Sequence, residues 1–211
     1  MSAAGSAASQ PVYRWRVVDI VIAAVLGVVS GVVFWAWALP WQGGLSAVLG
    51  VTPGLQGLLN GGWLFAGPLG ALVVRKPGAA IFASTVGGAV ELLLGDSWGF
   101  ANFIYGVLQG LGAELVFALL VYRYWNIAAV ALAGAGAGVL DAILDLSLYY
   151  AGSGSGFSAT YFVTTVVSGA VAAAVFWFVV RALAATGALD RFPAGRGGRI
   201  IDDVARDGDA A

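Results

Sequence analysis

The chain has 211 residues, of which 60% are hydrophobic and 10% are charged, and its mean hydropathy is +0.91. Because a soluble domain carries about 25% charged residues, this composition excludes an ordinary soluble fold. The formal net charge is −1, and the lack of Cys and His excludes disulfides, thiolate nucleophiles, imidazole bases and the usual soft-metal ligands.

Six apolar runs follow one another along the chain, separated by short turn-forming segments. A bilayer core needs roughly 20 apolar residues of helix, and the third run is the shortest. The runs are Val17–Leu39, Leu55–Val74, Ala79–Leu94, Phe103–Tyr122, Ile127–Tyr149 and Thr160–Leu183. The first is longer than the apolar region of a signal peptide, so we expect an uncleaved helix. These runs predict an all-α membrane protein whose domain, residues 14–184, is a bundle of six transmembrane helices between mobile tails at 1–13 and 185–211.

The basic residues lie beside alternate ends of these runs or in the tails. They are Arg14, Arg16, Arg75, Lys76, Arg123, Arg181, Arg191, Arg196, Arg199 and Arg206. Under the positive-inside rule, all of them belong to one face of the membrane. We therefore predict a multi-pass protein of the cell membrane with both termini cytoplasmic.

Four carboxyl groups fall inside the predicted spans, with no basic side chain at a comparable depth. They are Glu91, Glu114, Asp141 and Asp145. Ionisable groups inside a membrane are costly and by default indicate function. The missing positive charge could arrive with a ligand, or the carboxyl groups could be protonated.

Polar and aromatic residues crowd toward the predicted outer ends of the spans, and we take them with the acids as a candidate binding site. They are Asn60, Trp63, Asn102, Tyr105 and Gln109. At about 100° per residue, the last three share one helix face, and Asp141 and Asp145 share another. Glu114 lies about 140° from Gln109, so either its helix is distorted or it faces another helix.

A structural role remains open for several of these residues. Asp145 could bond a neighbouring helix, Asn102 could cap its helix after Gly99, and Trp63 could anchor its helix or contact a ligand. If they do form a pocket, its carboxylates and aromatic faces suit a cationic or hydrogen-bond-donating aromatic ligand. Such a pocket disfavours anionic substrates.

Small residues recur at intervals of four along the first run, at Ala23, Gly27 and Gly31. This spacing lets another helix approach closely, either within the bundle or from a partner protein. The sequence alone leaves both alternatives open.

The sequence lacks the residues and motifs that several classes of protein need. The chain has no phosphate-binding G-x-x-x-x-G-K-[ST] loop and no detectable repeat of two halves, and its single lysine is Lys76. We therefore expect binding without catalysis, with no catalytic residues, cofactor, metal site or nucleic-acid partner.

Three stretches, Trp63–Gly70, Val86–Glu91 and Tyr105–Glu114, together resemble the YkoE-type substrate-binding (S) components of energy-coupling factor (ECF) transporters. The similarity runs from about Arg16 through Arg181. It implies a six-helix subunit that captures thiamine or its hydroxymethylpyrimidine precursor from outside the cell.

The resemblance also implies partners. These would be a transmembrane coupling subunit and two cytoplasmic ATPases, with the stripe that contains Ala23 and Gly27 meeting the coupling subunit and loop Pro40–Gly54 gating the pocket. Two alternatives remain: an autonomous proton- or cation-coupled carrier, in which the acids relay protons, and a membrane scaffold, in which they bond between helices.

Overall fold

The computed structural model describes residues 14–189, 192 and 194–195, and this part of the chain contains helices and loops but no strand. The helices are α1 (Val17–Pro40), α2 (Ser46–Gly50), α3 (Ala66–Val74), α4 (Ala79–Leu93), α5 (Ala101–Leu119), α6 (Ile127–Leu148) and α7 (Ser155–Ala185). Five segments are long and apolar enough to cross a membrane, and α4 is a shorter apolar helix. The prediction of a multi-pass all-helical protein is therefore confirmed, and the third run is the short one, as the sequence indicates.

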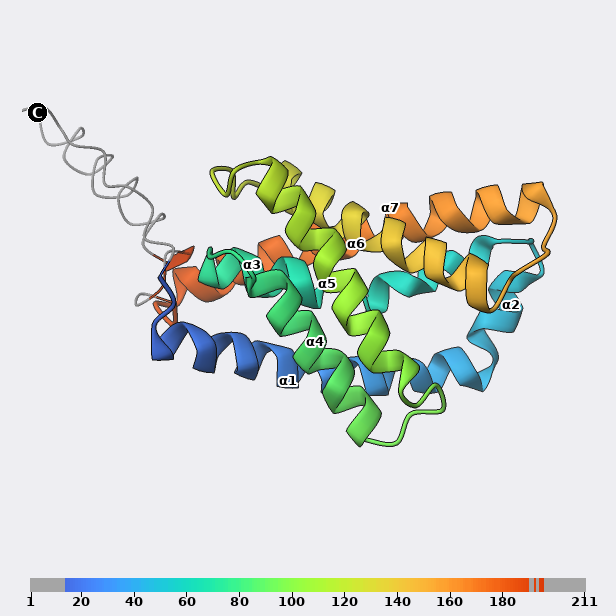
Figure 1. Ribbon diagram of the computed structural model, residues 1–211, viewed down its shortest axis with the longest axis horizontal. Coiled ribbons are helices and arrows are strands. Elements are labelled where there is room, and N and C mark those ends of the chain that lie inside the picture. Colours follow the sequence, from blue (N-terminus) through green and yellow to red (C-terminus); the bar gives the residue numbers. More distant parts are fainter. Residues whose placement is uncertain (1–13, 190–191, 193, 196–211) are drawn as a thin grey trace, which may run out of the picture.

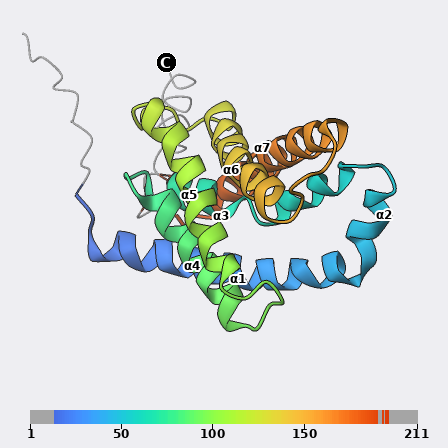
Figure 2. The same cartoon turned by 45° about the vertical axis from the view of Figure 1, so that its right-hand side comes forward.

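The helices form a bundle in which chain neighbours pack side by side. In Figure 1, α1 runs along one edge, α6 and α7 run along the opposite edge, and the α4–α5 hairpin crosses between them. The view in Figure 2 keeps this arrangement, with α1 beside α4 and α6 beside α7. The hairpin therefore separates α1 from α6.

The second predicted span is broken in the middle. A 3-10 helix, η2 (Leu55–Gly62), precedes α3, and Trp63–Phe65 between them is a turn. Glycines let η2 pack closely against α7: a Cβ at Gly61 would lie 2.8 Å from the carbonyl oxygen of Ser168. The expected continuous helix is thus wrong in detail, and Trp63, which is partly buried, lies in the break.

The predicted loop at Pro40–Gly54 is mostly helical. A π-helical turn, η1 (Trp41–Leu45), continues directly from α1 and leads into α2. Gly44 lies at φ 109°, a left-handed conformation that favours glycine, and it bends the chain between the two helices. This segment covers one end of the molecule in Figure 1.

The stripe of small residues on α1 packs inside the bundle and does not face outward. Ala23 is fully buried, and Cβ atoms at Gly27 and Gly31 would lie 2.6 Å from Val86 Cβ and 2.5 Å from the Gly87 carbonyl oxygen. Both contacts belong to α4. The expectation that these three residues meet a coupling subunit is therefore corrected: in the structure they join α1 to α4.

Part of the segment predicted as a mobile tail, residues 185–211, packs against the bundle. Phe192 is buried in the main hydrophobic cluster, and Leu189 and Ala194 pack against it. The predicted mobile segment 1–13 and most of residues 190–211 lie outside the described residues, so the expectation for them stays untested.

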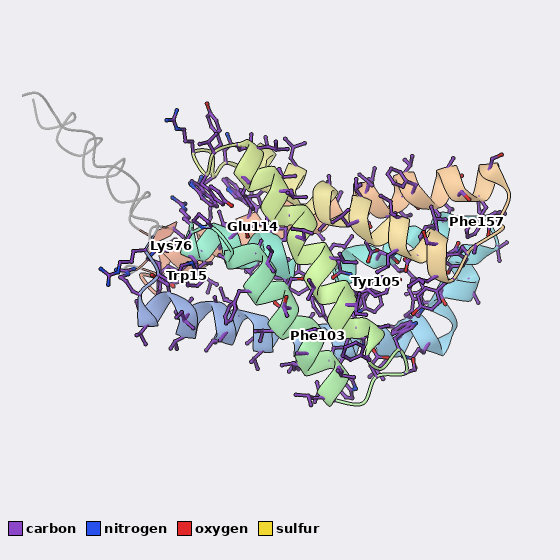
Figure 3. The ribbon with its side chains drawn as sticks, in the orientation of Figure 1. Trp15, Lys76, Phe103, Tyr105, Glu114 and Phe157 are labelled. Carbon is purple, nitrogen blue, oxygen red and sulfur yellow. The ribbon has the colours of Figure 1, made fainter. Side chains whose placement is uncertain are left out.

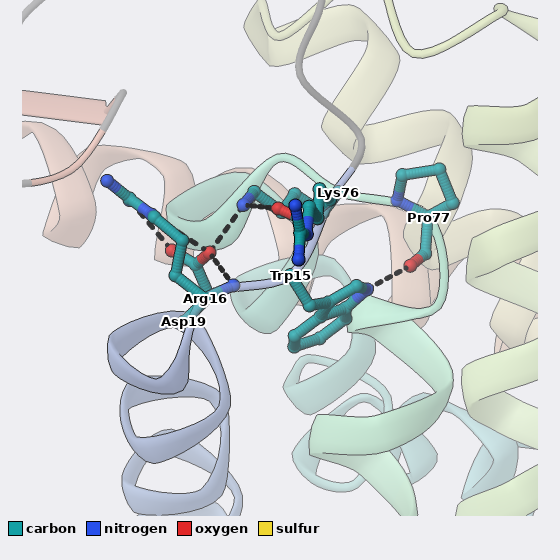
Figure 4. Close-up of polar contacts among 6 residues, drawn as sticks. Trp15, Arg16, Asp19, Lys76 and Pro77 are labelled. Carbon is teal, nitrogen blue, oxygen red and sulfur yellow. Dashed lines mark hydrogen bonds and ion pairs between the residues drawn. The ribbon is translucent and has the colours of Figure 1, made fainter.

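The six described basic residues gather at one end of the bundle, here called the basic end: Arg14, Arg16, Arg75, Lys76, Arg123 and Arg181. Figure 4 shows how this end is tied together: Asp19 of α1 accepts hydrogen bonds from Arg16 and Lys76, and Trp15 Nε1 donates to the Pro77 carbonyl at 3.0 Å. Sequence analysis overlooked Asp19 as a buried acid. Unlike the other four, it has basic partners.

Candidate functional site

A cavity of about 200 Å³ lies inside the bundle, away from the basic end. Its lining comes from every long segment of the bundle: Phe34, Trp41, Asn60, Trp63, Gly88, Glu91, Trp98, Asn102, Tyr105, Gly106, Gln109, Asp141, Asp145, Tyr149, Tyr150 and Tyr161. None of these lining residues is basic. In Figure 3, Tyr105 lies at mid-bundle, while Lys76 and Glu114 lie toward the basic end.

Two aspartates of α6 form one wall of the cavity. Asp141 and Asp145 share a helix face, as the sequence predicts, and Asn60 Nδ2 of η2 donates to both carboxylates, at 2.8 and 2.9 Å. Gln109 Nε2 donates to Asp141 at 2.8 Å. Tyr105 donates to Asp145 at 2.5 Å, and Tyr161 of α7 also donates to it.

This network makes the aspartate wall a junction between helices. Hydrogen-bond donors from η2, α5 and α7 converge on two acids of α6, and both carboxylates are buried. Because every carboxylate oxygen has a donor within the protein, the fold itself compensates much of the cost of burying these groups. The sequence left open that Asp145 could bond a neighbouring helix, and in the structure it accepts hydrogen bonds from η2, α5 and α7.

The opposite wall joins an acid to three indole rings. Glu91, near the end of α4, is buried and accepts a hydrogen bond from Trp63 Nε1 at 2.8 Å. The rings of Trp41, Trp63 and Trp98 meet edge to face with centroids 5.7 to 6.4 Å apart. Trp63 therefore belongs to the cavity and does not anchor a helix end.

The Glu91 wall also contains a polar group without a protein partner. Asn102 of α5 is 7% exposed, and its Nδ2 atom is buried with no hydrogen-bond partner among the described residues. The residue before α5 is Phe100, and no side chain caps this helix, so the alternative of Asn102 as a helix cap is wrong.

Glu114 does not belong to this site. Its carboxylate accepts hydrogen bonds from the backbone N–H groups of Gly78 and Ala80, at 2.7 and 2.9 Å, and from the Tyr122 hydroxyl at 2.7 Å. These amides begin α4 at the basic end, where a negative charge complements the helix dipole. The prediction that Glu114 binds the ligand is corrected, because Glu114 does not line the cavity. The alternative that it faces another helix is confirmed, and that helix is α4.

Sequence reasoning missed much of the aromatic lining. Aromatic residues at the ends of membrane helices are typical interfacial anchors, so sequence patterns alone do not assign Trp41, Trp98, Tyr149 and Tyr150 to a cavity. Tyr161 carries no such signal. The phenols of Tyr149 and Tyr150 line the cavity as possible hydrogen-bond donors. Within residues 14–189, 192 and 194–195, no cluster of three or more His, Cys, Asp or Glu could hold a metal ion.

The fold and the cavity define a multi-pass membrane protein with an enclosed, acidic and aromatic interior. The family model described as "ABC-type cobalt transport system, permease component" matches residues 18–140. A curated relative, the proposed HMP/thiamine permease protein YkoE of Bacillus subtilis (strain 168), is 32% identical over 184 residues, which are 86% of this chain and 91% of the relative.

A solved structure described as an S-component of an ECF transporter superposes with a TM-score of 0.81. It is 30% identical, and the match covers 94% of this chain and 99% of that one. The chain therefore belongs to the family of S components of energy-coupling factor transporters, in its YkoE branch. Members of this family are transport subunits and not enzymes.

Proposed function

We propose that this protein captures thiamine or its hydroxymethylpyrimidine precursor (HMP) for an ECF importer. The membership of the family supports a vitamin-type substrate, and the name of the YkoE relative suggests this particular class. A membrane coupling subunit and two cytoplasmic ATPases would complete the transporter.

The observation that carries the proposal is the chemistry of the cavity. Carboxyl groups line two walls of the cavity, indole and phenol rings line much of the rest, and none of the lining residues is basic. An aminopyrimidine is flat and rich in N–H donors, so carboxylates can accept its hydrogen bonds while aromatic faces stack on its ring. The thiazolium of thiamine would add a cation, which the same groups attract.

The proposed direction of capture follows from the separation of charge. The cavity lies away from the basic end, and positive residues favour the cytoplasmic face. We therefore place the basic end and both termini in the cytoplasm and the cavity toward the outside. Ligand would enter beside η1 and α2, whose residue Trp41 lines the cavity.

Fluorescence titration of the purified protein tests the proposal, because three indoles line the cavity and report on its occupancy. We expect thiamine or HMP to change tryptophan emission with a dissociation constant below about micromolar, the value that corresponds to roughly 8 kcal/mol of binding free energy. Glu91→Gln should weaken binding by at least tenfold, whereas Glu114→Gln, at the basic end, should leave affinity within a factor of two in folded protein.

Two results would contradict the proposal. One is the absence of binding by either compound in protein that is monodisperse and melts cooperatively. The other is concentrative uptake into liposomes by this chain alone, driven by a pH gradient without ATPases, which would identify an autonomous carrier.

A further inference from the structure

The two acidic walls of the cavity differ in how far the protein satisfies them. At the aspartate wall, Asn60, Tyr105, Gln109 and Tyr161 donate to the carboxylates. At the other wall, Trp63 is the one donor to Glu91 that the described residues supply. A ligand gains most where it completes groups that the fold leaves incomplete.

Glu91 and Asn102 belong to two helices in close contact, α4 and α5. Gly88 lies one turn before Glu91 on the same helix face, and a Cβ at Gly88 would lie 2.3 Å from the Asn102 carbonyl oxygen. Only glycine allows this approach, which brings the first turn of α5 against the last turns of α4. Both side chains line the cavity and are at least nine-tenths buried.

Asn102 supplies the observation that points to a ligand. Buried amide groups are almost always hydrogen-bonded, because an unpaired one loses its bonds to water without compensation. Asn102 Nδ2 has no partner among the described residues, and Asn102 lines the same cavity as Glu91. A bound molecule with a hydrogen-bond acceptor at this position would satisfy it.

Asp96 adds negative charge at the same place. It lies in the α4–α5 loop, close enough to Glu91 for their carboxyl groups to interact, and its Oδ2 atom is buried without a donor among the described residues. Two carboxyl groups facing each other without a cation favour a ligand that brings N–H donors. The wall thus presents an acceptor at Glu91, whose carboxyl group Asp96 approaches from the loop, and a donor at Asn102.

We infer that Glu91 and Asn102 together recognise one edge of the ligand, on which an N–H donor lies next to a ring nitrogen that accepts a hydrogen bond. The exocyclic amine donates to the Glu91 carboxylate, the neighbouring ring nitrogen accepts from Asn102 Nδ2, and the ring lies among the indoles. The inference rests on the proposed function and deepens it: the pair selects 4-aminopyrimidines over 4-oxopyrimidines, whose edge has the opposite pattern of donor and acceptor.

The test compares HMP with its 4-oxo counterpart, in which a C=O replaces the amine and the adjacent ring nitrogen carries a hydrogen. Titrations are run above the pKa of the pyrimidine ring, so that both ligands are neutral. Each mismatched buried group should weaken binding by about tenfold to a hundredfold, so wild-type protein should prefer HMP at least tenfold.

Variants of the pair should change this preference in a defined direction. Glu91→Gln offers an N–H to the oxo group, and Asn102→Asp accepts the ring N–H of the oxo compound. Each should lower the ratio of affinities by at least tenfold. Asn102→Leu, which removes the whole amide and with it the Nδ2 donor, should weaken HMP about tenfold. The control is Glu114→Gln, which changes a buried acid outside the cavity and should leave the ratio unchanged.

The outcomes separate the inference from the function on which it rests. If folded wild-type protein binds neither HMP nor thiamine, the proposed function and the inference both fall. If HMP binds but its preference over the oxo compound survives Glu91→Gln, Asn102→Asp and Asn102→Leu, the inference alone is overturned. Size-exclusion profiles and melting curves show which variants are folded, and any one folded variant of the three decides the matter.

Discussion

Hydrogen-bond partners, and not burial alone, decide what a buried carboxyl group does in this protein. Glu91 and Glu114 both lie in apolar helices without a basic residue in the same helix, so sequence reasoning separates them only by their helical angles. The structure gives Glu91 a single indole donor in the cavity and gives Glu114 two backbone amides and a phenol. The first carboxyl group is left for a ligand, and the second completes the fold.

Replacement of Glu114 should therefore affect stability and not recognition. Glu114→Leu leaves the amides of Gly78 and Ala80 buried without an acceptor, at a cost of about 1–3 kcal/mol for such a group. We expect a lower melting temperature in detergent and an unchanged ligand dissociation constant in the folded fraction. Glu91→Leu is the matched control and should show the reverse. A loss of affinity in Glu114→Leu without loss of stability would contradict this assignment.

At the scale of single residues, sequence patterns predict which residues line the site better than they predict the hydrogen-bond partners of those residues. The faces shared by Asp141 with Asp145, and by Tyr105 with Gln109, follow from helical periodicity and are present in the cavity. The pairing of Lys76 with Asp19 is not predictable in this way, because the two residues are 57 positions apart and meet only through tertiary packing. The unpartnered amide of Asn102 is likewise a property of its surroundings.

Among the elements, helix positions followed from hydropathy, whereas helix breaks and helix contacts did not. The hydropathy of the run Leu55–Val74 does not show that it divides at Trp63–Phe65, and the only local signal is the pair Gly61 and Gly62. The stripe on α1 correctly indicated a close helix contact, but spacing alone cannot name the neighbour. The neighbour is α4, the helix that carries Glu91.

The α1–α4 contact should be sensitive to a single methyl group. In Gly31→Ala, the new Cβ would lie 2.5 Å from the Gly87 carbonyl oxygen, which belongs to the backbone of α4 and cannot rotate away. Overpacking of this kind costs about 1–3 kcal/mol, so the melting temperature should fall. Gly43→Ala is the matched control, since nothing lies within 4 Å of its added Cβ. Equal melting temperatures for the two variants would contradict the packing described here.

In the whole molecule, charge and cavity are separated along the bundle. The basic end holds Lys76 with its partner Asp19, and the cavity with its acids lies toward the other end, beyond Glu114. With the basic end in the cytoplasm, as proposed, the cavity lies toward the outside. It can then bind ligand from outside the cell before the coupling subunit acts, so the proposed direction of transport is inward.

Labelling of single cysteines tests that orientation directly, since the natural chain has none to interfere. Ser153→Cys places a thiol in the exposed α6–α7 loop on the cavity side, and Tyr124→Cys places one in the α5–α6 loop at the basic end, where Tyr124 is 57% exposed. In intact cells, a membrane-impermeant maleimide should label the first and spare the second, because positive loops stay in the cytoplasm. Permeabilised cells should label both, which shows that each thiol is reactive. The opposite pattern in intact cells would turn the cavity toward the cytoplasm and exclude capture from outside.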